Sequence, residues 1–178
     1  KFDELLQRLS QNEIIKNFGL GKEGKAKKDS REGEELVLRY FAFRESADSY
    51  EGNLSKFLDK YMKIASSYDE EKLASLNDDF EKSLAACLIV FDEEEVFSDI
   101  GKDRRRQGVV YYDLLMNTLG KVPKRILRRK KSNIRTAFID LCNSPAFRKS
   151  TAGGLQRKSS INKRNLEWNS KLQESISD

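Results

Sequence analysis

The sequence predicts an all-α protein, built as an irregular, orthogonal bundle of about six to nine helices. Three observations support this fold class. Apolar residues recur at spacings of three and four along most of the chain, which is the period of an amphipathic helix. Only 2 prolines interrupt the pattern, and no segment alternates apolar and polar residues as a half-buried strand would. A length of 178 residues with 38% hydrophobic residues fits a single folded domain over 1–178.

The segment Glu35–Phe43 is the predicted central helix, because its apolar residues fall on nearly every side of a helix. Asp29 or Ser30 is the expected N-cap, and the helix should end near Arg44. Arg39 lies among these apolar residues, where an unpaired charge would be costly. We therefore expect a structural ion pair between Arg39 and Glu35, one turn earlier.

The helices around this segment follow from capping and turn residues. Phe2–Leu9 is a predicted helix, and a short helix opened by Asn12 follows it. Residues 19–30 are rich in glycine and lysine and predict a flexible loop. Asn53 caps an amphipathic helix that reaches Ala65, and Asp69 begins a longer helix that reaches Phe91.

The second half of the chain continues the helical pattern. Acidic residues at a helix C-terminus oppose the helix dipole, so the chain should break at Asp92–Glu95, and a loop or short helix should follow to Gly108. Further helices are expected over Val109–Leu119 and from Pro123, with a restart near Ser132. One more turn should follow Ser144. Ser159 or Ser160 should cap a trailing helix over 159–178.

Charge is divided unevenly along the chain. Up to Asp103 there are 16 Lys and Arg against 24 Asp and Glu, whereas from Arg104 onward there are 18 against 5. A segment this basic predicts an anionic partner, such as nucleic acid. The acidic half of the same molecule is the alternative partner.

The strongest functional signal is the stretch from Lys121 to Arg135, which carries 8 cations and no acid. Ile126, Leu127 and Ile134 should hold one side of this stretch on the core, which leaves a cationic side able to neutralise phosphates without recognising base sequence. Arg104–Arg106 and the later Arg157, Lys158, Lys163 and Arg164 add to this signal. The proposed nucleic-acid-binding residues are Lys121, Lys124, Arg125, Arg128, Arg129, Lys131 and Arg135, of which Lys124, Arg128, Lys131 and Arg135 share one helical face.

No catalytic, metal or cofactor site emerges from the residues. The glycine-rich segment Gly19–Ala26 resembles a phosphate-binding loop, but it has Ala26 where a hydroxyl should contact magnesium and helix where a strand should precede it. Consecutive carboxylates such as Asp92–Glu95 point in different directions on a helix, so a solvated helix end is the expected outcome. The sequence has no histidine. Cys87 and Cys142 lie on apolar faces and are expected to be reduced core thiols.

Several segments together resemble a known family. Glu35–Phe43, Tyr50-Glu51-Gly52, Tyr112-Asp113 and Ser144–Phe147 are similar to the helical region that follows the ParB-like domain in GmrSD-type bacterial proteins. The resemblance extends from about Arg31 onward. It implies a part of a defence protein that restricts modified phage DNA, with a ParB-like domain upstream that carries an Asp-Gly-Gln-Gln-Arg motif, and often an HNH nuclease.

This chain has neither the Asp-Gly-Gln-Gln-Arg motif nor the histidine that an HNH centre needs. The resemblance therefore implies a non-catalytic helical module of an anti-phage restriction protein, which binds the DNA backbone or positions the nuclease domain. The alternative is a structural or oligomerisation module, such as a homo-oligomer, with no nucleic-acid contact. The start at Lys1 predicts a fragment of a longer protein. No apolar run approaches about 20 residues, so we expect a cytoplasmic location and no membrane partner.

Overall fold

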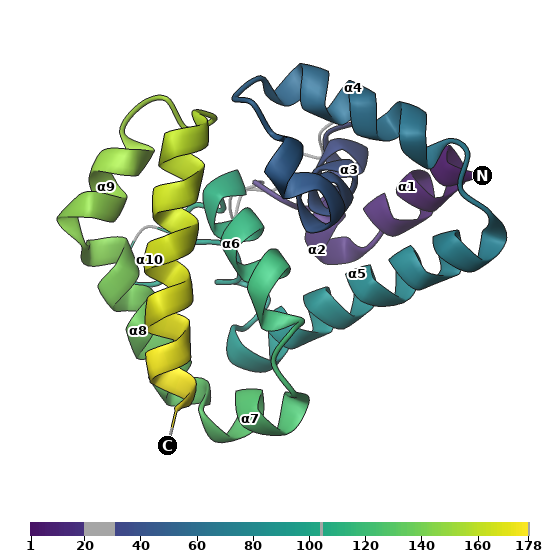
Figure 1. The fold of residues 1–178 in the computed structure, drawn as a ribbon. Helices are drawn as coiled ribbons and strands as arrows, with labels where there is room; N and C mark the ends of the chain where they lie inside the picture. The colour runs from purple at the N-terminus through teal and green to yellow at the C-terminus, as the bar shows by residue number, and fades with distance from the viewer. Residues whose placement is uncertain (20–30, 104, 178) are drawn as a thin grey trace. The chain divides into compact units, whose positions relative to one another are not determined.

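The computed structural model describes residues 1–19, 31–103 and 105–177. The all-α prediction is confirmed, because the described residues form ten α-helices and one 3₁₀ helix (Figure 1). The one β feature in this part of the chain is an isolated antiparallel bridge between Ser98 and Gln107. None of the described helices combines the length and the apolar character that crossing a membrane requires.

The chain divides into two compact units, Lys1–Lys82 and Ser83–Asp178. The expectation of one domain over 1–178 stays a prediction. The first unit contains α1 (Phe2–Ser10), α2 (Glu13–Lys16), α3 (Arg31–Ser46), a 3₁₀ helix (Ala47–Ser49), α4 (Leu54–Ala65) and the first part of α5 (Glu70–Val90). The second contains the end of α5, then α6 (Val109–Leu119), α7 (Lys124–Arg129), α8 (Lys131–Asn143), α9 (Pro145–Thr151) and α10 (Lys158–Ile176).

Helix α3 is the core helix of the first unit. Tyr40 and Phe41 are both fully buried, and their rings lie 5.4 and 6.0 Å from the ring of Phe80 on α5. The helix reaches Ser46, slightly beyond the predicted end at Arg44. The predicted caps Asp29 and Ser30 and almost all of the 19–30 loop lie outside the described residues.

Arg39 is buried as expected, with 3% of its surface exposed, and its guanidinium lies 5.0 Å from the centre of the Phe43 ring. This position allows a cation–π contact. Glu35 is exposed on the same helix. The ion pair between Glu35 and Arg39 stays a prediction.

Glu45, near the end of α3, gathers polar contacts that the sequence pattern did not indicate. One of its oxygens accepts hydrogen bonds from Tyr61 at 2.6 Å and Tyr68 at 3.2 Å, and the other contacts the Lys72 ammonium. Burial opposes the charge on Glu45, but the hydrogen bonds from Lys72 and Tyr61 outweigh it and lower the pKa of the carboxyl. These contacts join α3, α4 and α5 of the first unit at one carboxylate.

In the second unit, α6 and α10 are joined by aromatic and polar contacts. The Trp168 indole is fully buried, donates a hydrogen bond of 2.9 Å to the Thr118 hydroxyl, and lies 5.4 Å from the Phe138 ring. Gly120 is the C-cap of α6 and has a second role. A Cβ at Gly120 would lie only 2.9 Å from the Cα of Ser83, so glycine permits close approach of the two backbones.

Two expectations about the last helix need correction. Helix α10 begins at Lys158, after Arg157, and neither Ser159 nor Ser160 caps it. Arg164 is not a surface cation, because it is 4% exposed and donates hydrogen bonds to the carbonyls of Ser150 and Leu155. Its charge satisfies backbone acceptors near the end of α9, which a count of charges along the sequence could not show.

Both cysteines are buried and unpaired, as predicted. Burial raises the pKa of the Cys142 thiol to about 12 and also raises that of Cys87. A thiol that resists ionisation is a weak nucleophile. Cys87 and Cys142 therefore fit the role of small core residues.

Candidate nucleic-acid interface

Helix α7 carries basic residues on its exposed side and packs a short apolar side against the core. Pro123 precedes the helix as its N-cap, and its fixed φ favours entry into the first turn. Leu127 is fully buried and Val122 is 8% exposed, so the apolar side of this segment lies against the core of the second unit. The remaining positions of α7, apart from the half-buried Ile126, are left for solvent.

Those positions are occupied by cations. Lys124, Arg125, Arg128 and Arg129 on α7 are all exposed, and Lys121 just before the helix is exposed as well. Lys124, Arg125 and Arg128 make no ion pair with any described residue. Lys124 and Arg125 lie in the first turn, where positive charge opposes the helix dipole. Helix stability therefore does not explain why cations occupy these positions.

The single cationic face expected over Lys124, Arg128, Lys131 and Arg135 is divided in the structure. The chain leaves helical geometry at Lys130, where φ is −103° and ψ is 15°, and α8 restarts at Lys131 rather than at Ser132. Lys130 donates a hydrogen bond of 2.9 Å to the carbonyl of Ser177, near the chain end. A lysine has good helix propensity, so the residue type gave no sign of a break.

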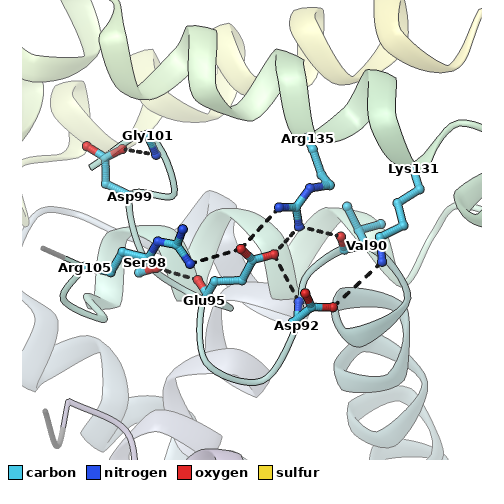
Figure 2. Close-up of polar contacts among 9 residues, drawn as sticks. All are labelled: Val90, Asp92, Glu95, Ser98, Asp99, Gly101, Arg105, Lys131 and Arg135. Atoms are coloured by element: carbon cyan, nitrogen blue, oxygen red, sulfur yellow. Dashed lines mark hydrogen bonds and ion pairs between the residues drawn. The ribbon is translucent and has the colours of Figure 1, made fainter. Parts of the chain in front are cut away.

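In the part of the basic segment that lies on α8, Arg135 binds a buried carboxylate. Both terminal nitrogens of Arg135 contact Glu95, one at each carboxylate oxygen, the second pair 3.2 Å apart (Figure 2). Arg105 contributes a further ion pair at 3.3 Å, and the backbone N–H of Asp92 donates to Glu95 at 3.2 Å. Only 5% of the Glu95 side chain is exposed, so this carboxylate depends on its partners.

Arg135 also binds the end of α5. Its guanidinium donates a hydrogen bond of 3.2 Å to the carbonyl of Val90 and lies 5.7 Å from the centre of the Phe91 ring. The hydrogen bond from Arg135 is the largest influence on Glu95 and lowers the pKa of its carboxyl despite burial. The same contact raises the pKa of Arg135. Arg135 therefore holds the segment after α5 against α8 within the second unit.

The acidic run Asp92–Glu95 is only partly the solvated helix end that was expected. Asp92, Glu93 and Glu94 are exposed, but Glu95 is buried, because the chain turns after Phe91 and directs that side chain toward Arg135. Asp92 forms a longer ion pair with Lys131 at 3.9 Å, and 77% of its side chain is exposed. Such an exposed pair contributes little to stability.

Asp99 is a second buried acid in this loop. It is 5% exposed, accepts a hydrogen bond of 3.1 Å from the backbone N–H of Gly101 and pairs with Lys102 at 3.3 Å. Asp followed two residues later by Gly is typical of a turn in which the carboxylate binds the backbone, so the local sequence contained this signal. The described residues contain no group of His, Cys, Asp and Glu able to hold a metal ion.

The structure thus separates the predicted binding residues into two groups. Lys124, Arg125, Arg128 and Arg129 are exposed on α7 and Lys121 is exposed just before it, while Lys131 and Arg135 face the acids of the preceding loop. No known family, curated protein or solved structure matches this chain. The similarity to the helical region of GmrSD-type proteins stays a prediction from sequence.

Proposed function

We propose that the chain is a non-catalytic helical module that binds the phosphate backbone of DNA through α7, as part of a GmrSD-type anti-phage restriction protein with a ParB-like domain upstream. The sequence resemblance supports the family assignment. The observation that carries DNA binding is the exposed group of Lys124, Arg125 and Arg128, none of which is engaged by a described acid. Helix α7 would contribute affinity, and the chemistry would belong to another domain.

The proposed contacts differ in kind. Arg125 and Arg128 have planar guanidinium groups that suit paired hydrogen bonds to phosphate oxygens, whereas Lys124 supplies a compact charge. All three side chains project from one short helix, and the buried Leu127 holds this helix in place, so the three cations form one surface. Lys131 and Arg135 are left out of this proposal, because their charges are already used by Asp92 and Glu95.

The test is a DNA-binding titration followed by fluorescence anisotropy at several salt concentrations. Three phosphate contacts predict that the logarithm of the binding constant falls with the logarithm of salt with a slope of about −3. The triple variant Lys124→Ala/Arg125→Ala/Arg128→Ala should lose most of the binding and most of this slope.

A matched control is available in the first unit. Lys56, Lys60 and Lys63 are exposed on α4, so changing them to alanine removes the same charge from a different surface. This control variant should keep DNA binding close to that of the unchanged chain. Absence of binding at low salt, or equal losses in the two triple variants, would contradict the proposal.

A second candidate function is a structural or oligomerisation module. The pairing of Arg135 and Lys131 with the acidic run favours it, because basic residues that the sequence offered to a partner are partly neutralised within the unit. This alternative predicts no DNA binding and a concentration-dependent mass. Sedimentation of the full chain, with and without Glu93→Gln and Glu94→Gln, distinguishes it from the DNA-binding proposal.

A further inference from the structure

We infer that the exposed side of α10 docks against the same side of α10 in a second copy of this chain, as an antiparallel pair related by a two-fold axis beside Leu166. The inference does not depend on DNA binding by α7. It rests on the oligomerisation part of the second candidate function and deepens it, because it names the surface through which two copies associate. Three observations carry it: an exposed leucine, a nearly uncharged surface around that leucine, and an order of charges on α10 that complements itself.

Leu166 lies on the side of α10 that faces solvent. Helix α10 packs against α6, α8 and α9 in the second unit (Figure 1). Its buried residues Ile161, Trp168 and Leu172 face those helices. Leu166 lies on the opposite side and is 75% exposed, the largest value among the large hydrophobic side chains of the described residues. Exposure of an apolar side chain to water is unfavourable, so a second copy that covers Leu166 would gain from its burial.

The side of α10 that carries Leu166 has few charges, although charged residues make up 35% of the chain. Asparagine and serine are weaker helix formers than lysine or glutamate, so helix stability does not explain their presence on an exposed side. The centres of protein interfaces are depleted in Lys, Glu and Asp, so the composition fits a covered surface better than a solvated one. Apart from Lys163, the exposed residues on this side are Ser159, Asn162, Asn169, Ser170 and Gln173.

The amide groups on this side match each other when two copies of α10 run antiparallel. With Leu166 of one copy against Leu166 of the other, a residue before Leu166 lies beside a residue of the partner copy that follows it by a similar number of positions. Asn162 is four positions before Leu166 and Asn169 is three positions after it, so the two differ in height by about 1.5 Å. They are seven positions apart and therefore share one edge of the exposed side. An amide both donates and accepts, so Asn162 of each copy can hydrogen-bond Asn169 of the other.

Lys163 and Glu167 give the pairing its charge complementarity. They are four positions apart and share the other edge of the exposed side, with Lys163 before Leu166 and Glu167 after it. No ion pair joins them to each other or to another described residue, and a lysine four positions before a glutamate is the less favourable order within one helix. In the antiparallel pair, Lys163 of each copy comes close to Glu167 of the other, which forms two ion pairs related by the two-fold axis. A parallel pair would not bring these residues together.

The contact is small, so the association should be weak. Helix α10 has 19 residues and a length of about 28 Å. A standard interface buries about 1,600 Å² in total, more than one pair of helices of this length is expected to cover. We therefore expect a reversible equilibrium in which the dimer fraction rises with protein concentration.

The test is sedimentation equilibrium of the full chain, without DNA, at several protein concentrations. Leu166→Glu should raise the dissociation constant of the dimer by more than about tenfold, because it replaces an apolar contact with two like charges beside the axis. The matched control is Ile64→Glu on α4, where the side chain is 46% exposed, and this variant should associate as the unchanged chain does. Circular dichroism checks that both variants keep their helical content.

A charge swap tests the antiparallel orientation. Lys163→Glu alone should weaken the dimer by about three- to tenfold, because glutamates of the two copies then lie close together. The double variant Lys163→Glu/Glu167→Lys should restore the affinity, because each ion pair forms again with its charges exchanged.

Each contrary result overturns a stated part of the inference. A chain that stays monomeric at every accessible concentration would overturn the dimer itself. A dimer that survives Leu166→Glu but is lost in Glu93→Gln/Glu94→Gln would show that the interface is the acidic run and not α10. Failure of the double charge swap to restore association would show that the helices are not antiparallel. These measurements contain no DNA, so failure of the DNA-binding proposal would not change them.

Discussion

Helices α7 and α8 carry neighbouring parts of one basic run, yet the structure uses their charges differently. On α7, Lys124, Arg125 and Arg128 face solvent, whereas on α8 the guanidinium of Arg135 is bound to Glu95. The residue types are the same, and the two helices are separated by Lys130 alone. What differs is the surface that each helix faces, since α8 lies beside the loop that carries Asp92 and Glu95 (Figure 2).

This difference teaches that a run of cations is not one functional surface. If a guanidinium that pairs with a buried carboxylate moved to a phosphate, the carboxylate would remain buried without that partner, which is strongly unfavourable. An exposed cation has no such constraint. The α8 cations should therefore matter for stability and the α7 cations for binding, and the following variants test this division.

The largest effect on stability is expected at the apolar anchor of α7. Leu127→Ala removes a fully buried side chain and should lower the free energy of unfolding of the second unit by about 3 kcal/mol. Trp168 is the one tryptophan of the chain and lies in this unit, so its fluorescence during guanidinium denaturation reports the transition. Arg125→Ala, on the exposed side of α7, is the control and should change stability by less than about 0.5 kcal/mol. Equal effects of the two changes would show that α7 is not anchored through Leu127.

The next largest effect comes from comparing one arginine on each helix, Arg135 on α8 and Arg128 on α7. Arg135→Ala leaves Glu95 buried with Arg105 as its remaining charged partner, and should destabilise the second unit by about 2–3 kcal/mol. Arg128→Ala makes the same change on α7 and should leave stability within about 0.5 kcal/mol. DNA affinity should respond in the opposite order. If Arg135→Ala weakens DNA binding more than Arg128→Ala while stability is unchanged, the division between the two helices is wrong.

A smaller effect should appear as a pH dependence. The pKa of Glu95 is lower in the folded chain than its value of about 4.3 when unfolded. The stability that the ionised Glu95 carboxylate contributes is therefore fully present above the unfolded pKa, and it is lost as the pH falls through the lowered folded-state pKa. Glu95→Gln should be less stable than the unchanged chain by about 1–2 kcal/mol at neutral pH, with the gap closing on acidification.

The exposed neighbour gives the matched control for this pH measurement. Glu93→Gln removes an equal charge from the same acidic run, but Glu93 is exposed, so the acid-induced loss of stability should persist in this variant. Urea denaturation followed by Trp168 fluorescence at several pH values makes the comparison. A constant gap between Glu95→Gln and the unchanged chain at every pH would show that ionisation of Glu95 does not contribute.

The sequence predicted helices well and side-chain partners poorly. The spacing of apolar residues located α3 and α6. Asn12, Asn53 and Ser144 are N-caps, as their residue types indicated. The predicted N-cap of α10 was wrong, because Arg157 holds the position expected for a serine. Such local signals depend on neighbouring residues, so they are visible in the chain itself.

The partners of charged residues depend on contacts between segments far apart in sequence. Glu95 and Arg135 are separated by 40 positions, and nothing in either local pattern indicates that they meet. The same holds for Arg164, whose burial follows from the packing of α10 near the end of α9.

By itself, the sequence determined the all-helical class, most helix positions and the presence of a basic segment, because helical periodicity and local charge are properties of adjacent residues. Only the tertiary structure decided which cations remain exposed on α7 and which neutralise a buried acid. The reason is physical: the environment of a charge is set by whatever the fold places within a few ångströms of it, and that neighbour can come from anywhere in the chain.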